Sequence, residues 1–71
     1  MNTEHAQLLI DAGIKMLVAA NNQLAVYQHG FIRKEIGDAA VEMLTAIKIA
    51  EPDKVLPNMP HLHKYFLEKL T

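Results

Sequence analysis

Apolar residues recur along the first third of the chain with the spacing of an amphipathic helix. Steps of four and three residues alternate there, which is a heptad pattern sustained over three repeats. The positions in the pattern are Ala6, Ile10, Gly13, Leu17, Ala20, Leu24 and Tyr27. We therefore expect a long helix over about residues 3–29, capped at its start by Asn2 or Thr3.

The pair Asn21-Asn22 is the weak point of this predicted helix, because asparagine side chains compete for backbone hydrogen bonds. The heptad pattern crosses the pair without a change of phase, so we expect one continuous helix. Gly30 then suits the left-handed position that ends many helices. Asp11 precedes Lys15 by four residues, the favourable order for an ion pair on a helix.

A second helix is predicted over residues 31–50, where the same spacing of apolar residues continues. Its expected buried positions are Ile32, Ile36, Ala39, Met43, Ala46 or Ile47, and Ala50. Gly37 interrupts the pattern and costs about 1 kcal/mol relative to alanine inside a helix. It therefore either lies within the helix or marks a break, after which Asp38 caps a new segment.

The stretch from residue 51 to residue 60 contains three prolines and is expected to be a connector with a short turn. Helical spacing returns over residues 60–70, where Leu62, Phe66 and Leu70 lie four residues apart. The whole chain, residues 1–71, is thus expected to be one all-α domain. The predicted architecture is an antiparallel helical hairpin with a short C-terminal helix.

The first predicted helix is apolar around more than half of its circumference, which one partner helix cannot cover. We therefore expect the chain to assemble as a homodimer or to bind an unidentified protein. Aromatic residues often anchor such interfaces. The candidate anchors are Tyr27, Phe31, Tyr65 and Phe66.

Composition and charge argue against several other classes of protein. The 71 residues carry a formal net charge of −1, and the basic residues Arg33, Lys34, Lys48 and Lys54 form no long run, so nucleic-acid binding is not indicated. No segment has the length of apolar sequence that crosses a membrane. The start MNTEHAQLLIDAG lacks the basic leader of a signal peptide. With no cysteine in the chain, we expect a cytoplasmic protein.

Three acids offer the main candidate for chemistry. Glu35, Asp38 and Glu42 lie at i, i+3 and i+7, so a helix places them on one face, where carboxylates could share a Mg²⁺ or Mn²⁺ ion. Over this stretch the E-x-x-D pair resembles the second half-motif of the all-α nucleoside-triphosphate pyrophosphohydrolases. The resemblance implies magnesium ligation by Glu35 and Asp38 beside a triphosphate. That family carries an E-x-x-E pair on the preceding helix, whereas this chain offers Glu4 and Asp11, seven residues apart.

The simpler interpretation is that the three acids belong to a cap and a solvated stripe of an amphipathic helix. On this interpretation the protein is a non-enzymatic interaction module, without a cofactor, that acts as an adaptor, regulator or inhibitor. The alternative is a metal-dependent protein that binds or hydrolyses nucleotides and is completed across a dimer.

Overall fold

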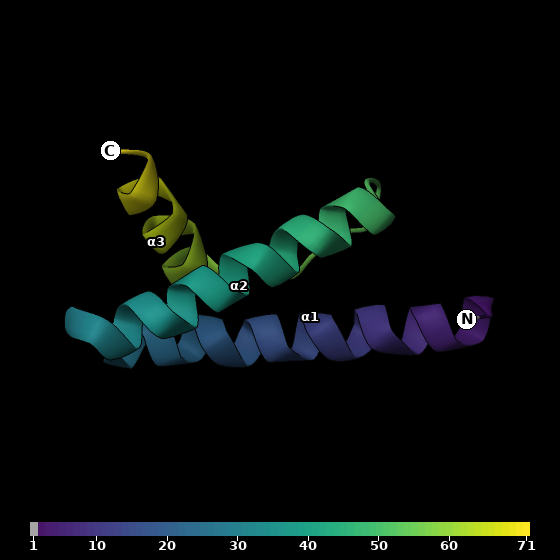
Figure 1. Ribbon diagram of the computed structural model, residues 1–71, viewed down its shortest axis with the longest axis horizontal. Coiled ribbons are helices and arrows are strands. Elements are labelled where there is room, and N and C mark those ends of the chain that lie inside the picture. Colours follow the sequence, from purple (N-terminus) through teal and green to yellow (C-terminus); the bar gives the residue numbers. More distant parts are fainter. Residues whose placement is uncertain (1) are drawn as a thin grey trace.

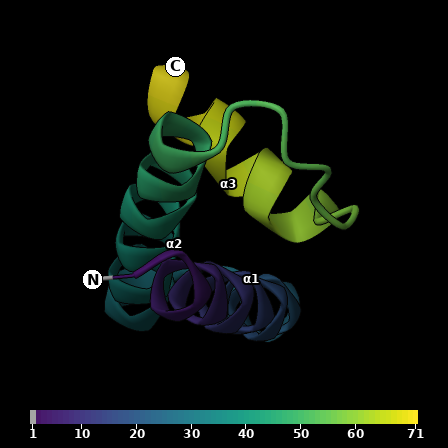
Figure 2. The same ribbon diagram turned by 90° about the vertical axis from the view of Figure 1, so that its right-hand side faces the viewer.

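The computed structural model describes residues 2–71, which form three helices and no strand. The helices are α1 (Thr3–Val26), α2 (Gly30–Ala50) and α3 (Pro60–Leu70). The predicted all-helical class is confirmed for these residues. Figure 1 shows α2 running back from the turn at an angle to α1, so that the two helices separate in this view toward the end of α2, and Figure 2 shows α3 on one side of the α1–α2 pair. Within residues 2–71, no helix combines the length and the apolar character that crossing a membrane requires.

Helix α1 begins as predicted and runs through Asn21-Asn22 without a break. The Asn2 side chain caps it, accepting a hydrogen bond from the His5 backbone N–H at 2.8 Å. The helix ends at Val26, three residues earlier than expected. Tyr27 has an extended backbone there, and Gly30, with φ of 90°, begins α2. Gly30 therefore has the left-handed conformation expected of it, in the turn between the helices.

Helix α2 runs through Gly37, so the possible break with Asp38 as a cap is not formed. A Cβ atom at residue 37 would overlap the ring of Tyr65 from α3. Glycine is required at this position because α3 brings an aromatic ring directly against the backbone of α2. The helix-propensity cost of Gly37 thus accompanies close packing between α2 and α3.

The buried face of α2 differs from the predicted one and is a correction to the sequence interpretation. Ile32, Ala39, Ala46 and Ala50 are exposed, and Ile36 and Met43 are half-buried. The buried residues are Arg33, Gly37, Ala40 and Ile47, and of these only Ile47 was among the predicted positions. The face turned toward the core therefore lies about one residue further along the sequence, because Arg33 and Gly37 have specific partners there.

Helix α3 is attached to α1 by a side chain that caps it from a distance. Pro60 occupies the first turn of α3, and no side chain next to it in sequence caps the helix. Asn21 of α1 does so instead: its Oδ1 atom accepts hydrogen bonds from the backbone N–H groups of His61 at 2.8 Å and Leu62 at 3.0 Å. All three helices contribute to the buried core, which consists of Leu17, Leu24, Ala40, Ile47, Leu62 and Tyr65.

Candidate functional site

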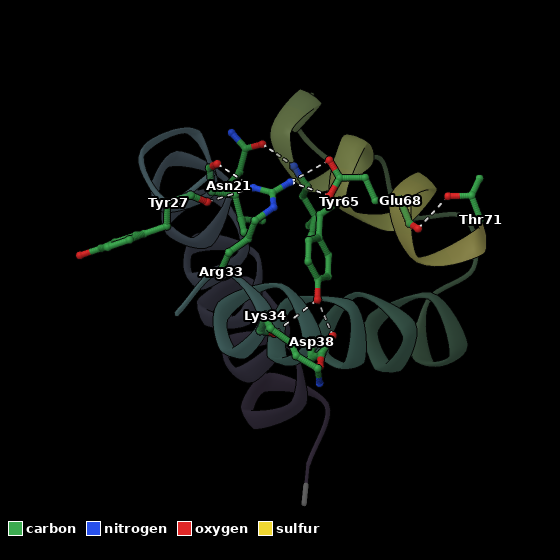
Figure 3. Close-up of polar contacts among 10 residues, drawn as sticks. Asn21, Tyr27, Arg33, Lys34, Asp38, Tyr65, Glu68 and Thr71 are labelled. Atoms are coloured by element: carbon green, nitrogen blue, oxygen red, sulfur yellow. Dashed lines mark hydrogen bonds and ion pairs between the residues drawn. The ribbon is translucent and has the colours of Figure 1, made fainter. Parts of the chain in front are cut away.

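Asp38 lies within α2 and its carboxylate accepts three hydrogen bonds. Figure 3 shows the one from the Tyr65 hydroxyl of α3. Tyr65 Oη and Lys69 Nζ each donate to Oδ1 at 2.6 Å, and Lys34 Nζ donates to Oδ2 at 2.8 Å. The expected role of Asp38 as a helix cap is therefore wrong, because α2 runs through it; its side chain is still 32% exposed. Its side chain joins α2 to α3.

The ionisation of Asp38 and Tyr65 fits a structural role. Hydrogen bonds from Lys34, Lys69 and Tyr65, the first being the largest cause, hold the pKa of the Asp38 carboxyl well below its usual range. Burial raises the pKa of Tyr65 to about 12, and the neighbouring Asp38 carboxylate acts in the same direction. The phenol therefore remains a hydrogen-bond donor to an ionised carboxylate at ordinary pH. Neither pKa lies near neutrality, where general acid–base catalysis is most effective.

The three acids of the predicted metal site have different surroundings. Glu35 and Glu42 are exposed and form no ion pair within residues 2–71, whereas Asp38 already binds two ammonium groups. A divalent ion at Asp38 would have to displace these groups, since both carboxylate oxygens are hydrogen-bonded. Among the described residues, no three or more His, Asp or Glu side chains are grouped so as to hold a metal ion.

Arg33 is buried and connects all three helices (Figure 3). Its Nη1 donates to the backbone carbonyls of Leu24 at 3.0 Å and Tyr27 at 3.1 Å, which satisfies acceptors at the C-terminal end of α1. Its Nη2 donates to both carboxylate oxygens of Glu68 on α3, at 3.2 and 3.1 Å. The guanidinium carbon lies 5.3 Å from the centre of the Tyr65 ring, within the range of a cation–π interaction.

These contacts form one set, which we name the polar clasp. Its members are Asn21, Arg33, Asp38, Tyr65, Glu68 and Lys69. The clasp fixes α3 against the α1–α2 pair, and Arg33 also binds the backbone carbonyls at the end of α1. In the sequence Arg33 stands out only as one of several scattered basic residues, and Asn21 only as a weak point of the helix, so neither was predicted to be a structural residue.

The four predicted aromatic anchors lie in three different places. Tyr27 and Phe31, 38% and 73% exposed, flank the turn between α1 and α2, and Tyr27 points away from the clasp in Figure 3. Phe66, 39% exposed, lies on α3. Tyr65 is a correction to the predicted set, because it is only 6% exposed and its hydroxyl is engaged by Asp38.

Phe66 lines a groove of about 860 Å³ between the second half of α2, the connector and α3. The groove is mainly apolar, and Leu44, Leu56 and Leu67 also line it. Lys48 and His63 are the ionisable residues in its lining. The groove is thus an accessible apolar surface on the side of the molecule that carries α3.

A second apolar surface covers both long helices. On α1, six exposed residues repeat at alternating steps of three and four: Leu9, Ala12, Met16, Ala19, Gln23 and Val26. On α2, six more exposed residues follow the same alternation: Ile32, Glu35, Ala39, Glu42, Ala46 and Ile49. We name these twelve residues the outer face. Each long helix therefore carries one heptad pattern that is buried in this chain and another that is exposed.

The outer face points away from α3. Asn21 marks the side of α1 that meets α3, and Gly37 marks that side of α2. At 100° per residue, Ala12, Met16 and Ala19 lie about 140–180° around α1 from Asn21. Ala39 and Ala46 lie at similar angles, about 160–180°, around α2 from Gly37. Both exposed patterns therefore lie on the side of the α1–α2 pair opposite the clasp.

The charges near the outer face are unpaired, unlike those of the clasp. Lys15, Glu35 and Glu42 form no ion pair within the described chain. The expected pairing of Lys15 with Asp11 is not formed, because Asp11 lies 3.5 Å from Lys54 of the connector instead. Lys15 is consequently free to meet a carboxylate from outside the chain.

Comparison with known proteins finds no family model, no curated protein and no solved structure that matches this chain.

Proposed function

We propose that this protein is a small, non-enzymatic helical interaction module that binds another protein chain through the outer face. It would act as an adaptor, a regulator or an inhibitor. The observation that supports this most strongly is the second heptad pattern on each long helix, every residue of which is exposed. Sustained three-four spacing is the pattern by which helices pack against helices, so the favoured partner surface is itself helical.

The energetics of the outer face support binding rather than simple exposure to solvent. Its large apolar residues Leu9, Met16, Val26, Ile32 and Ile49 are at least half exposed. Fully burying one such side chain contributes about 1.5–3 kcal/mol. Alanine at Ala12, Ala19, Ala39 and Ala46 would allow a partner helix to approach closely. A partner that covers this face thus gains apolar contact over most of both helices.

In this proposal α1 and α2 form an antiparallel hairpin that presents one continuous binding surface, which packs either on a second copy of the chain, as a homodimer, or on a host protein. The fold contains no cysteine and so needs no oxidising compartment, which supports a place in the cytoplasm. The hydrogen bonds that occupy both Asp38 oxygens support a non-enzymatic role, since the best candidate for chemistry is engaged in holding α3.

Native mass spectrometry of the protein purified from its own host tests the proposal. The informative variant is Met16→Glu, which places a charge at the centre of the outer face with a residue that favours helix. The matched control is Lys64→Glu on α3, an exposed residue outside the outer face. We expect the unaltered chain and the control to carry a bound protein, either a second copy or a host protein, and Met16→Glu to lose it. A bare monomer in all three samples would contradict the proposal.

A further inference from the structure

We infer that the partner of the outer face is a second copy of this chain, related by a twofold axis along the helices, so that α1 of each copy packs on α2 of the other. This inference rests on the proposed function and names the occupant of the same surface. The resulting assembly is a four-helix core, with each α3 on the outside.

The register of α1 against α2 within one chain gives the first argument. Gly13 lies against Met43 and Ile47, and the carbonyl of Leu24 meets Arg33. These contacts determine which residues of the two helices lie level with each other. The level pairs on the outer face are Leu9 with Ile49, Ala12 with Ala46, Ala19 with Ala39, and Val26 with Ile32.

The two patterns are therefore alike in the order of their side-chain sizes. Large apolar residues occupy both ends of the face, and alanine occupies the second position from one end and the middle of each pattern. A twofold axis along the helices keeps every residue at its own level, so each residue of α1 faces its level mate on the partner's α2. Leucine then meets isoleucine at one end, valine meets isoleucine at the other, and alanines face alanines between them. Isologous packing of this kind brings the same surface of both copies together.

Charge gives the second argument and selects the orientation. Met16 lies level with Glu42, so Lys15, beside Met16, meets Glu42 of the partner subunit, and the twofold axis forms this pair twice. Gln23 lies level with Glu35, so its amide can donate to Glu35 of the partner subunit. In the present chain Lys15, Glu35 and Glu42 have no ionic partner among residues 2–71. The assembly supplies opposite charge to Lys15 and Glu42, and a hydrogen-bond donor to Glu35.

The other twofold arrangement places α1 on α1 and α2 on α2. It would bring Glu35 and Glu42 of both copies into one interface, where the outer face of α2 offers no basic residue. Four carboxylates at close range oppose association. The two lysines of α2, Lys34 and Lys48, do not relieve this, since Lys34 binds Asp38 and Lys48 lines the groove beside α3. Charge therefore favours α1 on α2.

Analytical ultracentrifugation of charge-reversed variants tests this assembly. We expect the unaltered chain to be a dimer, Lys15→Glu and Glu42→Lys each to weaken it about tenfold, and the double variant to recover most of the loss. The control Lys64→Glu should leave the dissociation constant unchanged. Circular dichroism of each variant verifies that the helices are retained.

Two results would overturn the inference. One is a chain that remains a monomer at the highest concentrations measured. The other is a dimer that both single reversals leave intact, or that the double reversal fails to restore. The proposed function fails separately: a monomeric chain that binds a host protein, and loses it on Met16→Glu, removes the self-assembly and keeps the interaction module.

Discussion

The two sides of the α1–α2 pair carry the same spacing of residues and differ in what each residue meets. On the side that bears α3, Leu17, Leu24 and Ile47 are buried, and the charged groups of the clasp have partners. On the opposite side the spacing is equally regular, yet the apolar residues are exposed and Lys15 and Glu42 are unpaired. Periodicity alone therefore does not tell which face of a helix its own chain covers.

The polar residues make the difference between the two sides. Asn21 caps α3, and Arg33 binds both the end of α1 and Glu68, so α3 can attach to one side only. Directional hydrogen bonds thus determine which side of the α1–α2 pair α3 covers, and apolar contact supplies much of the stability. The outer face has apolar residues, but they are exposed, and no directional contact from α3 reaches them in the described chain.

The largest expected effect comes from placing a charge on each side in turn. Leu17→Asp buries a carboxylate in the core, where Leu17 is 1% exposed, and should unfold a domain of this size. Met16→Asp, at the adjacent position, should leave the chain helical because Met16 is 62% exposed. Circular dichroism at 25 °C compares the two variants directly. A folded Leu17→Asp chain would show that the buried side of α1 is assigned wrongly.

The second comparison removes one basic group from each side. Arg33→Met leaves the carbonyls of Leu24 and Tyr27 and the carboxylate of Glu68 without their donor, and should lower the free energy of unfolding by about 2–3 kcal/mol. Lys15→Met should change it by less than about 0.5 kcal/mol. Urea denaturation measures both, at a concentration where the chain is monomeric. Equal losses for the two variants would mean that the clasp is not what stabilises the fold.

A smaller effect is expected from the two neighbouring asparagines. Asn21→Ala removes the side chain that caps α3 and should cost about 1–2 kcal/mol. Asn22→Ala, at an exposed position of the same helix, loses only a long hydrogen bond of 3.4 Å from Asn21 Nδ2 and gains helix propensity, so it should change stability by less than about 0.5 kcal/mol. Thermal unfolding of the two variants provides the measurement. A loss at Asn22 as large as that at Asn21 would remove the capping role of Asn21.

The sequence predicts α1 and its buried pattern well because Leu17 and Leu24 obey the ordinary link between apolar character and burial. It misplaces the buried face of α2 because Arg33 and Gly37 are residue types that rarely form a core. Both residues are packed against α3, which lies more than twenty residues further along the chain. The local sequence pattern therefore does not indicate that they are buried. The pattern Arg33, Gly37, Ala40, Leu44 and Ile47 is nevertheless as regular as the predicted one.

The candidate site also has one part that the sequence predicts and one part that it does not. The excess of apolar surface on α1 is readable from the sequence, and the exposed residues Leu9 and Met16 account for part of it. The part of the outer face on α2 could not be predicted, because Ile32, Ala39 and Ala46 were assigned to the buried side of that helix. Asp38 and Tyr65 were treated as a possible ligand and a possible anchor, and only the fold shows that they bind each other.

The smallest effect concerns the ionisation of Tyr65 on the clasp side. Its pKa in the folded chain, about 12, lies above the value of about 10 for an unfolded tyrosine. The unfolded state therefore releases its proton first as the pH rises, so the contribution of Tyr65 to stability is complete below pH 10 and is lost between about pH 10 and 12. Tyr65→Phe should show a weaker fall in stability over this range.

Tyr27→Phe leaves Tyr65 as the lone tyrosine, so ultraviolet absorbance of the folded chain reports its titration. We expect a midpoint near pH 12, and a midpoint near pH 10 in the folded chain would contradict the burial of the phenol and its hydrogen bond to Asp38.

The most direct test of the outer face as the binding surface is an NMR dilution series on the ¹⁵N-labelled chain. With increasing concentration, backbone amide signals of the outer face on both α1 and α2 should shift together, including those of Ala12, Ala19, Ala39 and Ala46. Signals of the clasp residues Asn21 and Glu68 should stay in place. Shifts confined to the groove around Phe66, or no shift up to the highest concentration measured, would contradict assembly through the outer face.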